Sequence, residues 1–212
     1  MEEDDNSDLI RCKLILVGDS YVGKTSIIGR YINKYKENFQ ATISASFTST
    51  KLEIINGKQI NFELWDTAGE EKFRSVNNVF YRDAQICIMV FDITQRKTFE
   101  SLENYWYKEI KNECSEHTIF HVAGNKIDLF ENEQVNKDEV KAFCNKINCG
   151  FDFISAKENK FIDDLFQKLG EIYLKSDAYR NYKNNQHSKI RVSRPNNPNG
   201  IENGGNEGKG CC

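Results

Sequence analysis

The chain has 212 residues, of which 39% are hydrophobic and 29% are charged, a composition typical of one globular domain with tails. Its formal net charge of −3 gives no reason to expect a nucleic-acid partner. No apolar run reaches the roughly 18 residues that a membrane span needs, and the acidic start "MEEDDNSD" lacks the basic and then apolar profile of a secretory signal.

Three regions of the chain differ in composition. Residues 1–8 are acidic, and we expect them to be disordered. Residues 176–212 are rich in Asn, Gly, Lys and Arg, and they hold both prolines, Pro195 and Pro198. Because they carry few large apolar side chains, burial cannot offset the entropy cost of ordering them. We therefore expect a disordered tail over residues 176–212 and one globular domain over residues 9–175.

Strand-like and helix-like segments alternate through the globular part. Short apolar runs predict strands buried on both faces at residues 12–18, 86–92, 119–125 and 151–155. A capping box of Asn136 and Glu139 predicts the start of one helix between them. The apolar positions at helical spacing are Val140, Phe143, Cys144 and Ile147 in this helix, and Ile162, Leu165, Phe166, Leu169 and Tyr173 in the last helix.

One segment breaks this alternation. In "KLEIINGKQINFELW", residues 51–65, apolar residues occupy every second position around Asn56-Gly57, which predicts a two-stranded hairpin. The segments together predict an α/β fold of three layers. We expect a mostly parallel sheet with one antiparallel edge strand from the hairpin and helices on both faces.

A glycine-rich loop follows the first predicted strand. In "GDSYVGKTS", residues 18–26, Gly18, Gly23, Lys24 and Thr25 match the pattern G-x-x-x-x-G-K-[ST]. The glycines let successive N–H groups face a phosphate chain at a helix N-terminus. Lys24 then supplies a positive charge, and the Thr25 hydroxyl a ligand for Mg²⁺. The other loop residues expected at the phosphates are Asp19, Ser20, Val22 and Ser26. The bulky Tyr21 either narrows the mouth of the pocket or points to solvent.

Two short polar motifs end the next parallel strands. "NKID", residues 125–128, lies at the carboxyl end of a strand, where α/β sheets bind ligands. The Asp128 carboxylate can accept two hydrogen bonds from the ring N–H and the amino group of guanine. Adenine lacks this donor pair, so Asp128 would discriminate against it. "SAK", residues 155–157, ends the following strand and supports a guanine site.

With these motifs the chain resembles the Ras superfamily of small GTPases, and most of all its Rab branch, over residues 11–175. The resemblance implies a P-loop GTPase fold for the domain and a site for GTP or GDP with Mg²⁺. It assigns Asn125 and Lys126 to bracing and covering the base, and Ala156 to a backbone contact with it. Ser155 and Lys157 flank that contact. Tyr35 matches an aromatic residue that stacks on guanine, and the alternative is a solvent-facing tyrosine at a helix end.

The resemblance also assigns roles in two switch segments. Thr42 of "ATISASF" is expected to bind Mg²⁺ and the terminal phosphate in the triphosphate form. Asp66 is expected to hold the metal through water, and the Gly69 N–H to bind the terminal phosphate. The metal set implied by the family is thus Thr25, Thr42 and Asp66. Loss of these contacts on hydrolysis releases both segments and changes the protein surface.

Glu70 of "DTAGEEKF" stands where the family has a water-orienting glutamine. The amide accepts from the attacking water and donates toward the phosphoryl oxygens, whereas an ionised carboxylate only accepts and adds like charge. We therefore expect intact GTP binding and slow intrinsic hydrolysis, with Lys24, Gly69 and Glu70 as the catalytic set. The alternative is a Glu70 that is protonated, or that swings away while an activating protein supplies the missing group.

The segment "KFRSVNNVFYRDA", residues 72–84, is similar to the second switch of the Rab branch. Phe47, Trp65 and Phe80 match its exposed aromatic trio, which partners contact when the switches are ordered. The alternative is that these side chains pack into the domain, Trp65 in particular. The "ASF" sequence at residues 45–47 favours the endosomal members of the branch.

The chain ends in Cys211-Cys212, which resembles the double-prenylation signal of the Rab branch. Two lipid chains anchor a protein stably where one is marginal. The resemblance implies a switch at the cytoplasmic face of intracellular, endosomal membranes that is cytosolic when extracted and steers vesicle traffic. The partners it implies are effectors, an exchange factor, a GTPase-activating protein and a prenyl-lipid chaperone. No nucleic-acid partner is expected.

Two other functions stay open. Because of Glu70, the chain could be a hydrolysis-impaired, mostly GTP-loaded module that recruits effectors constitutively. A small-molecule kinase also begins with a phosphate loop, but it gives no reason for "NKID" and "SAK".

Cys12, Cys87 and Cys144 are expected to be reduced thiols that serve as small hydrophobic residues.

Overall fold

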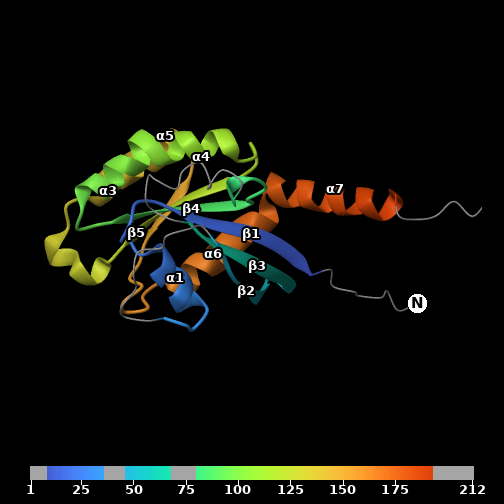
Figure 1. The fold of residues 1–212 in the computed structure, drawn as a ribbon, viewed down its shortest axis with the longest axis horizontal. Coiled ribbons are helices and arrows are strands. Elements are labelled where there is room, and N and C mark those ends of the chain that lie inside the picture. Colours follow the sequence, from blue (N-terminus) through green and yellow to red (C-terminus); the bar gives the residue numbers. More distant parts are fainter. Residues whose placement is uncertain (1–8, 36–45, 68–79, 193–212) are drawn as a thin grey trace, which may run out of the picture. The chain divides into compact units, whose positions relative to one another are not determined.

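The computed structural model describes residues 9–35, 46–67 and 80–192 (Figure 1). Its centre is a six-stranded sheet in the order β2-β3-β1-β4-β5-β6. The strands are β1 (Ile10–Val17), β2 (Ser46–Ile55), β3 (Lys58–Asp66), β4 (Ile86–Asp92), β5 (Ile119–Asn125) and β6 (Gly150–Phe153). Neighbouring strands are parallel except β2 and β3, which pair antiparallel at the edge. The predicted sheet is confirmed.

Helices cover both faces of this sheet. They are α1 (Lys24–Tyr31), α3 (Arg96–Ser101), the π-helix η2 (Leu102–Trp106), α4 (Tyr107–Glu113), the 3-10 helix η3 (Ile127–Asn132), α5 (Lys137–Ile147), α6 (Ile162–Lys175) and α7 (Asp177–Val192). In Figure 1 α3, α4 and α5 lie on one side of the sheet, and α1 and α6 on the other. Within the described ranges, no helix has the length and apolar character needed to cross a bilayer.

The hairpin between β2 and β3 turns on two residues. Asn56 and Gly57 both have positive φ, 51° and 75°, and Ile55 pairs with Lys58 across the turn. Two residues of positive φ are what a tight hairpin turn with the right-handed strand twist requires. The predicted hairpin is therefore confirmed, and it makes β2 the antiparallel edge strand.

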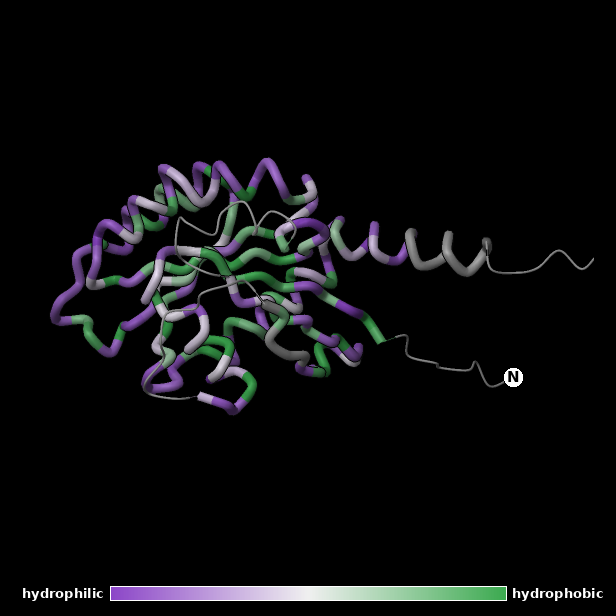
Figure 2. Tube along the Cα trace, viewed as in Figure 1, coloured by the Kyte–Doolittle hydropathy of each residue, from purple (hydrophilic) through white to green (hydrophobic). Residues whose placement is uncertain are grey.

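Each face of the sheet has its own apolar core, and Figure 2 shows apolar residues concentrated along the strands. Between the sheet and α3–α5, the Phe99 ring packs against Phe91 and Phe143, with ring centroids 5.1 and 5.9 Å away. On the other face, Tyr31 of α1 stacks on Phe166 of α6 with centroids 3.6 Å apart. Aromatic side chains thus pack against the sheet from both sides and support the strands from which the site loops leave.

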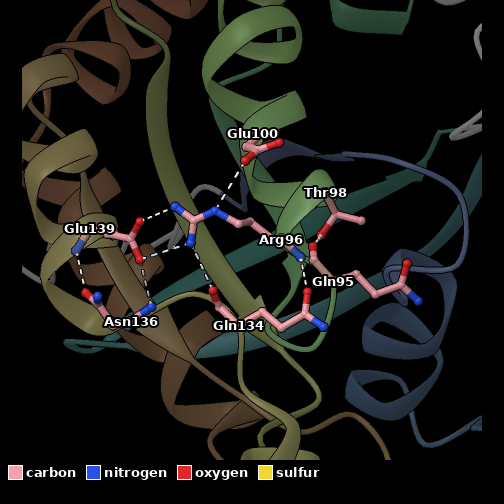
Figure 3. Close-up of polar contacts among 7 residues, drawn as sticks. All are labelled: Gln95, Arg96, Thr98, Glu100, Gln134, Asn136 and Glu139. Carbon is pink, nitrogen blue, oxygen red and sulfur yellow. Dashed lines mark hydrogen bonds and ion pairs between the residues drawn. The ribbon is translucent and has the colours of Figure 1, made fainter.

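Arg96 joins the start of α3 to the start of α5 (Figure 3). Its guanidinium donates to the Gln134 carbonyl at 3.0 Å, pairs with the Glu139 carboxylate, and lies 3.3 Å from Glu100. Glu139 also belongs to the predicted capping box, which is confirmed, since its N–H donates to Asn136 Oδ1 at 3.0 Å and its Oε2 accepts from the Asn136 N–H at 3.2 Å. One carboxylate therefore caps α5 and ties it to α3.

Helix α7 occupies part of the segment expected to be a disordered tail. The Ser176 Oγ accepts from the Tyr179 N–H at 3.3 Å and so caps the first turn. Ala178 and Tyr179 are buried, and the Tyr179 ring packs 5.6 Å from that of Tyr173. The structure therefore differs from the expectation over residues 177–192, because a cap and two buried side chains carry the fold past residue 176. The compact unit ends at Tyr179, and residues 1–8 and 193–212 lie outside the described residues.

Candidate functional site

The loops that carry the sequence motifs meet at one edge of the sheet. Strands β1, β4, β5 and β6 are parallel, so the segments that follow them leave at the same edge. These segments are the glycine-rich loop before α1, the "NKID" turn before η3 and the "SAK" loop after β6. Three motifs far apart in the chain thus form one candidate site.

Two glycines let the first loop pack closely against its neighbours. Gly18 and Gly23 have positive φ, 138° and 101°. A Cβ on Gly18 would lie 2.2 Å from the Val90 carbonyl oxygen, and one on Gly23 would lie 2.3 Å from the Asn125 side-chain nitrogen. Neither position tolerates a side chain, so the loop curls tightly enough for its N–H groups to face a bound anion.

Lys24 is a buried cation held inside this loop. Its side chain is 5% exposed, and its Nζ donates to the carbonyls of Gly18 at 2.7 Å and Asp19 at 2.8 Å. Burial lowers the pKa of Lys24 to about 8, although the charges of Asp66 and Asp19 oppose that shift. A buried ammonium that donates to two backbone carbonyls is a suitable partner for a phosphate group.

Thr25 and Asp66 place two oxygen ligands side by side. The Thr25 hydroxyl donates to Asp66 Oδ2 at 2.5 Å, and Asp66, at the end of β3, is 3% exposed. Hydroxyl and carboxylate oxygens are the hard ligands that Mg²⁺ prefers. These residues therefore fit the predicted magnesium site. The third predicted ligand, Thr42, lies outside the described residues.

Asn125 connects all three loops. Its Nδ2 donates to the Val22 carbonyl at 2.9 Å, and its Oδ1 accepts from the Ala156 N–H at 3.1 Å. The side chain is 2% exposed, so both bonds lie in the interior, where an unmade bond is costly. The expected brace of the base is thus also the brace between the phosphate loop and the "SAK" loop.

Asp128 and Lys126 are each held by a neighbour. The Ser155 hydroxyl donates to Asp128 Oδ1 at 2.6 Å and fixes the orientation of that carboxylate. The Lys126 ammonium lies 2.6 Å from Asp92 Oδ2 at the end of β4. Ser155 was expected near the base, and its contact here is with Asp128, the residue expected to read the base. A preset carboxylate pays less conformational entropy on binding.

Tyr35 is attached to the "SAK" loop through Arg30. The Arg30 guanidinium lies 3.6 Å from the centre of the Tyr35 ring, and it donates to the carbonyls of Ala156 at 2.8 Å and Lys157 at 2.6 Å. Tyr35 is therefore half-buried beside the expected base site. Tyr21 has a positive φ of 64°, and its side chain is 72% exposed. It therefore points to solvent and does not narrow the mouth of the pocket.

A buried tryptophan contacts the phosphate loop from outside. The Trp106 Nε1 donates to Asp19 Oδ1 at 2.7 Å, and Trp106 is 2% exposed. It ends the π-helix η2, and a π turn places its side chains differently from an α turn. Neither Trp106 nor Arg30 belongs to a motif that predicts a place at the site. What distinguishes them from ordinary helix residues is a distant partner: Trp106 bonds to Asp19 across 87 positions, and Arg30 bonds to Ala156 across 126 positions.

The predicted aromatic trio is contiguous. The Trp65 ring centroid lies 5.5 Å from that of Phe47 and 5.6 Å from that of Phe80. Phe47 is 51% exposed, whereas Trp65 and Phe80 are half-buried and Lys13 covers the Trp65 ring at 4.8 Å. The trio thus has one exposed member, and Trp65 packs partly into the domain.

Several other predicted residues lie outside the described residues. They are Thr42, Gly69, Glu70, Cys211 and Cys212. Their expected roles in metal binding, catalysis and lipid attachment stay predictions.

A phosphate loop joined to a carboxylate-bearing base turn defines a P-loop nucleotide-binding protein. The Ras family model matches residues 13–175. A probable Rab-related GTPase of Acanthamoeba polyphaga mimivirus is 37% identical over 177 residues, which cover 80% of this chain and 81% of that protein. Ras-related protein RabJ of Dictyostelium discoideum is 39% identical over 160 residues, or 75% of this chain and 62% of the relative. Human Ras-related protein Rab-21 is 37% identical over 158 residues, or 74% and 69%.

The chain therefore belongs to the Ras family, and its Rab-related relatives put it in the Rab branch. GTPase activity, binding of GTP and GDP, and use of Mg²⁺ are general properties of this family.

Trp106→Phe is expected to speed GDP release by about three- to tenfold, because it removes a hydrogen bond to a charged group of the phosphate loop while keeping an aromatic ring in the core. Stopped-flow dissociation of a fluorescent GDP analogue measures the rate. In an Asp19→Ala background the same substitution should have no further effect, since the acceptor is already gone. A Trp106→Phe rate equal to that of the wild-type protein contradicts the prediction.

Proposed function

We propose that this Rab-type GTPase cycles between GTP and GDP forms on intracellular membranes and recruits effectors that direct vesicle traffic. The observation that carries the proposal is the double hydrogen bonding of Asn125, which joins the phosphate loop to the loop expected at the base. A site joined in this way suits a ligand with a base at one end and phosphates at the other.

Each end of such a ligand has a group suited to it. Lys24 offers a buried ammonium to the phosphates, and Asp128, oriented by Ser155, offers a carboxylate to guanine. Thr25 and Asp66 would hold Mg²⁺, which when bound neutralises charge on the phosphate oxygens. The chain's own part is to position the nucleotide and to exclude competing bases.

Competition binding on the purified full-length protein tests this function. We expect GDP to displace a fluorescent GDP analogue at about a hundredfold or more lower concentration than ADP, because adenine leaves the Asp128 carboxylate unpaired. Asp128→Ala should reduce this preference to less than about tenfold. Equal competition by ADP and GDP would overturn the proposal.

We further propose that Glu70 slows intrinsic hydrolysis, which favours a mostly GTP-loaded form. Glu70→Gln is expected to raise the single-turnover hydrolysis rate by about tenfold or more, because the amide can donate to the phosphoryl oxygens and carries no like charge. Glu71→Gln, next to it, is the matched control and should hydrolyse at the wild-type rate. The idea fails if Glu70→Gln is no faster than the wild-type protein.

The second candidate function follows from the same residue. If hydrolysis stays slow with a GTPase-activating protein present, the chain acts as a constitutive effector scaffold rather than as a timed switch. In either case we propose lipid attachment at Cys211 and Cys212, and effector contact over Phe47, Trp65 and Phe80. The location would be the cytoplasmic face of endosomal membranes. The other proposed partners are an exchange factor and a prenyl-lipid chaperone.

A further inference from the structure

The C-terminal end of helix α5 holds two cysteines in one capping motif. Asn148 follows the helix with left-handed φ and ψ of 54° and 52°. The Cys149 N–H donates to the Cys144 carbonyl at 3.0 Å, and the Asn148 N–H donates to the Asn145 carbonyl at 3.3 Å. This pair of bonds around a left-handed residue is a Schellman motif.

The Schellman motif brings the side chains of the two cysteines together. In such motifs the residues at these two positions commonly make an apolar contact. Here both positions are cysteines, so the motif sets the Cys144 and Cys149 side chains side by side at the end of the helix. The 3.0 Å backbone bond also keeps the two Cα atoms within about 7 Å, the outer limit for a disulfide. A sulfur–sulfur bond can therefore form without a large backbone movement.

We propose that Cys144 and Cys149 form a dithiol site that small disulfides of the glutathione class oxidise reversibly to an intramolecular disulfide. Cys144 is 1% exposed, whereas Cys149 is partly exposed, so a small oxidant reaches Cys149 first. The site lies away from the nucleotide loops, at the opposite end of β6 from the "SAK" loop, and the inference does not rest on the proposed function.

Cys149, which the oxidant reaches first, is also the more acidic of the two thiols. The neighbouring Cys144 thiol lowers the pKa of Cys149, although burial opposes the shift. The neighbouring Cys149 sulfur, together with burial, raises the pKa of Cys144. Cys149 is the more exposed thiol as well as the more acidic one, so Cys149 attacks and the buried Cys144 resolves.

Other described cysteines lack this arrangement. Burial raises the pKa of Cys12, Cys87 and Cys114, and each stays a protonated thiol. Cys12 and Cys87 therefore behave as the small hydrophobic residues expected from the sequence. Cys144 packs in the same core cluster, but it has a second thiol as its partner.

The exchange balances in two steps. The Cys149 thiolate attacks one sulfur of glutathione disulfide, which breaks the oxidant's S–S bond, forms a mixed disulfide and releases one glutathione thiolate. The Cys144 thiol gives up its proton, and its sulfur attacks Cys149, which releases the second glutathione. The two released thiolates take up the two protons of the protein thiols. Two protein thiols are thus oxidised while one disulfide is reduced to two thiols.

Peptide mapping of the full-length protein tests the site. Trypsin cleaves after Lys146, between the two cysteines, so an intramolecular disulfide joins peptide 142–146 to peptide 147–157. After equilibration in glutathione buffers and trapping by alkylation, we expect this linked pair in the folded protein. It should reach half its maximum at about a tenfold or more lower proportion of glutathione disulfide than in the same protein unfolded in urea.

Two single variants test the assigned order. Cys144→Ser should trap a mixed glutathione disulfide on Cys149, because the resolving thiol is absent. Cys149→Ser should leave Cys144 unmodified in the folded protein, because Cys144 is buried and protonated. The proposal is overturned if the linked peptides form no more readily in the folded protein than in urea, or if Cys144 is modified in Cys149→Ser.

Discussion

Asn125→Ala is expected to weaken GDP binding by about thirtyfold or more and to lower the stability of the GDP-bound protein. The substitution leaves the Val22 carbonyl and the Ala156 N–H in the interior without their bonds. Each orphaned group costs about 1 to 3 kcal/mol, and we expect a total of about 2 to 4 kcal/mol. Because both groups belong to nucleotide loops, much of this cost falls on binding.

Isothermal titration with GDP and thermal unfolding measure the two effects. Asn132→Ala is the matched control, since Asn132 is an exposed asparagine of η3, and we expect it to behave as the wild-type protein does. Should Asn125→Ala bind GDP within about threefold of wild type, the assignment of Asn125 as the connecting brace is wrong.

Lys24→Met is expected to separate binding from stability. It should weaken GDP binding by about a hundredfold or more, because it removes the one buried cation that faces the expected phosphates from within the glycine-rich loop. The nucleotide-free protein, in contrast, should become more stable at pH 7 by about 1 to 2 kcal/mol. The reason is that burial lowers the pKa of Lys24 to about 8, so folding disfavours the ammonium form.

The pH dependence follows from the direction of that shift. Below pH 8 the folded protein holds the ammonium, and the cost of burying it is fully present. Between pH 8 and the ordinary value of 10.5 the cost falls, since the folded form loses its proton first. Urea unfolding in the presence of EDTA at pH 7 and pH 9.5 should therefore show a smaller advantage of Lys24→Met at the higher pH. An advantage that grows with pH would refute this account.

Local signals explain which parts of the fold were predictable. The hairpin at Asn56-Gly57 and the Asn136–Glu139 capping box each depend on residues within three positions of one another. The phosphate loop is equally local, since its glycines, lysine and threonine follow one strand. Such features follow from backbone preferences that a short segment carries by itself.

The rest of the site depends on distant contacts. Trp106 lies at the end of the π turn η2 and reaches Asp19, which is 87 residues earlier in the chain. Arg30 is one polar residue among many until the fold brings it to Ala156. The extent of α7 was missed for a similar reason, because the burial of Tyr179 depends on the domain beneath it. Composition alone describes that segment as a tail.

The close approach of Gly23 to Asn125 has a consequence for molecules that imitate only part of the natural ligand. One amide side chain fills the space above the glycine and also bonds to the loop on the far side. A displacement of the glycine-rich loop would therefore move Asn125 and, through it, the "SAK" loop. Free guanosine or free pyrophosphate would contact only one of the two loops that this amide joins, and each would bind far more weakly than its share of the intact nucleotide suggests.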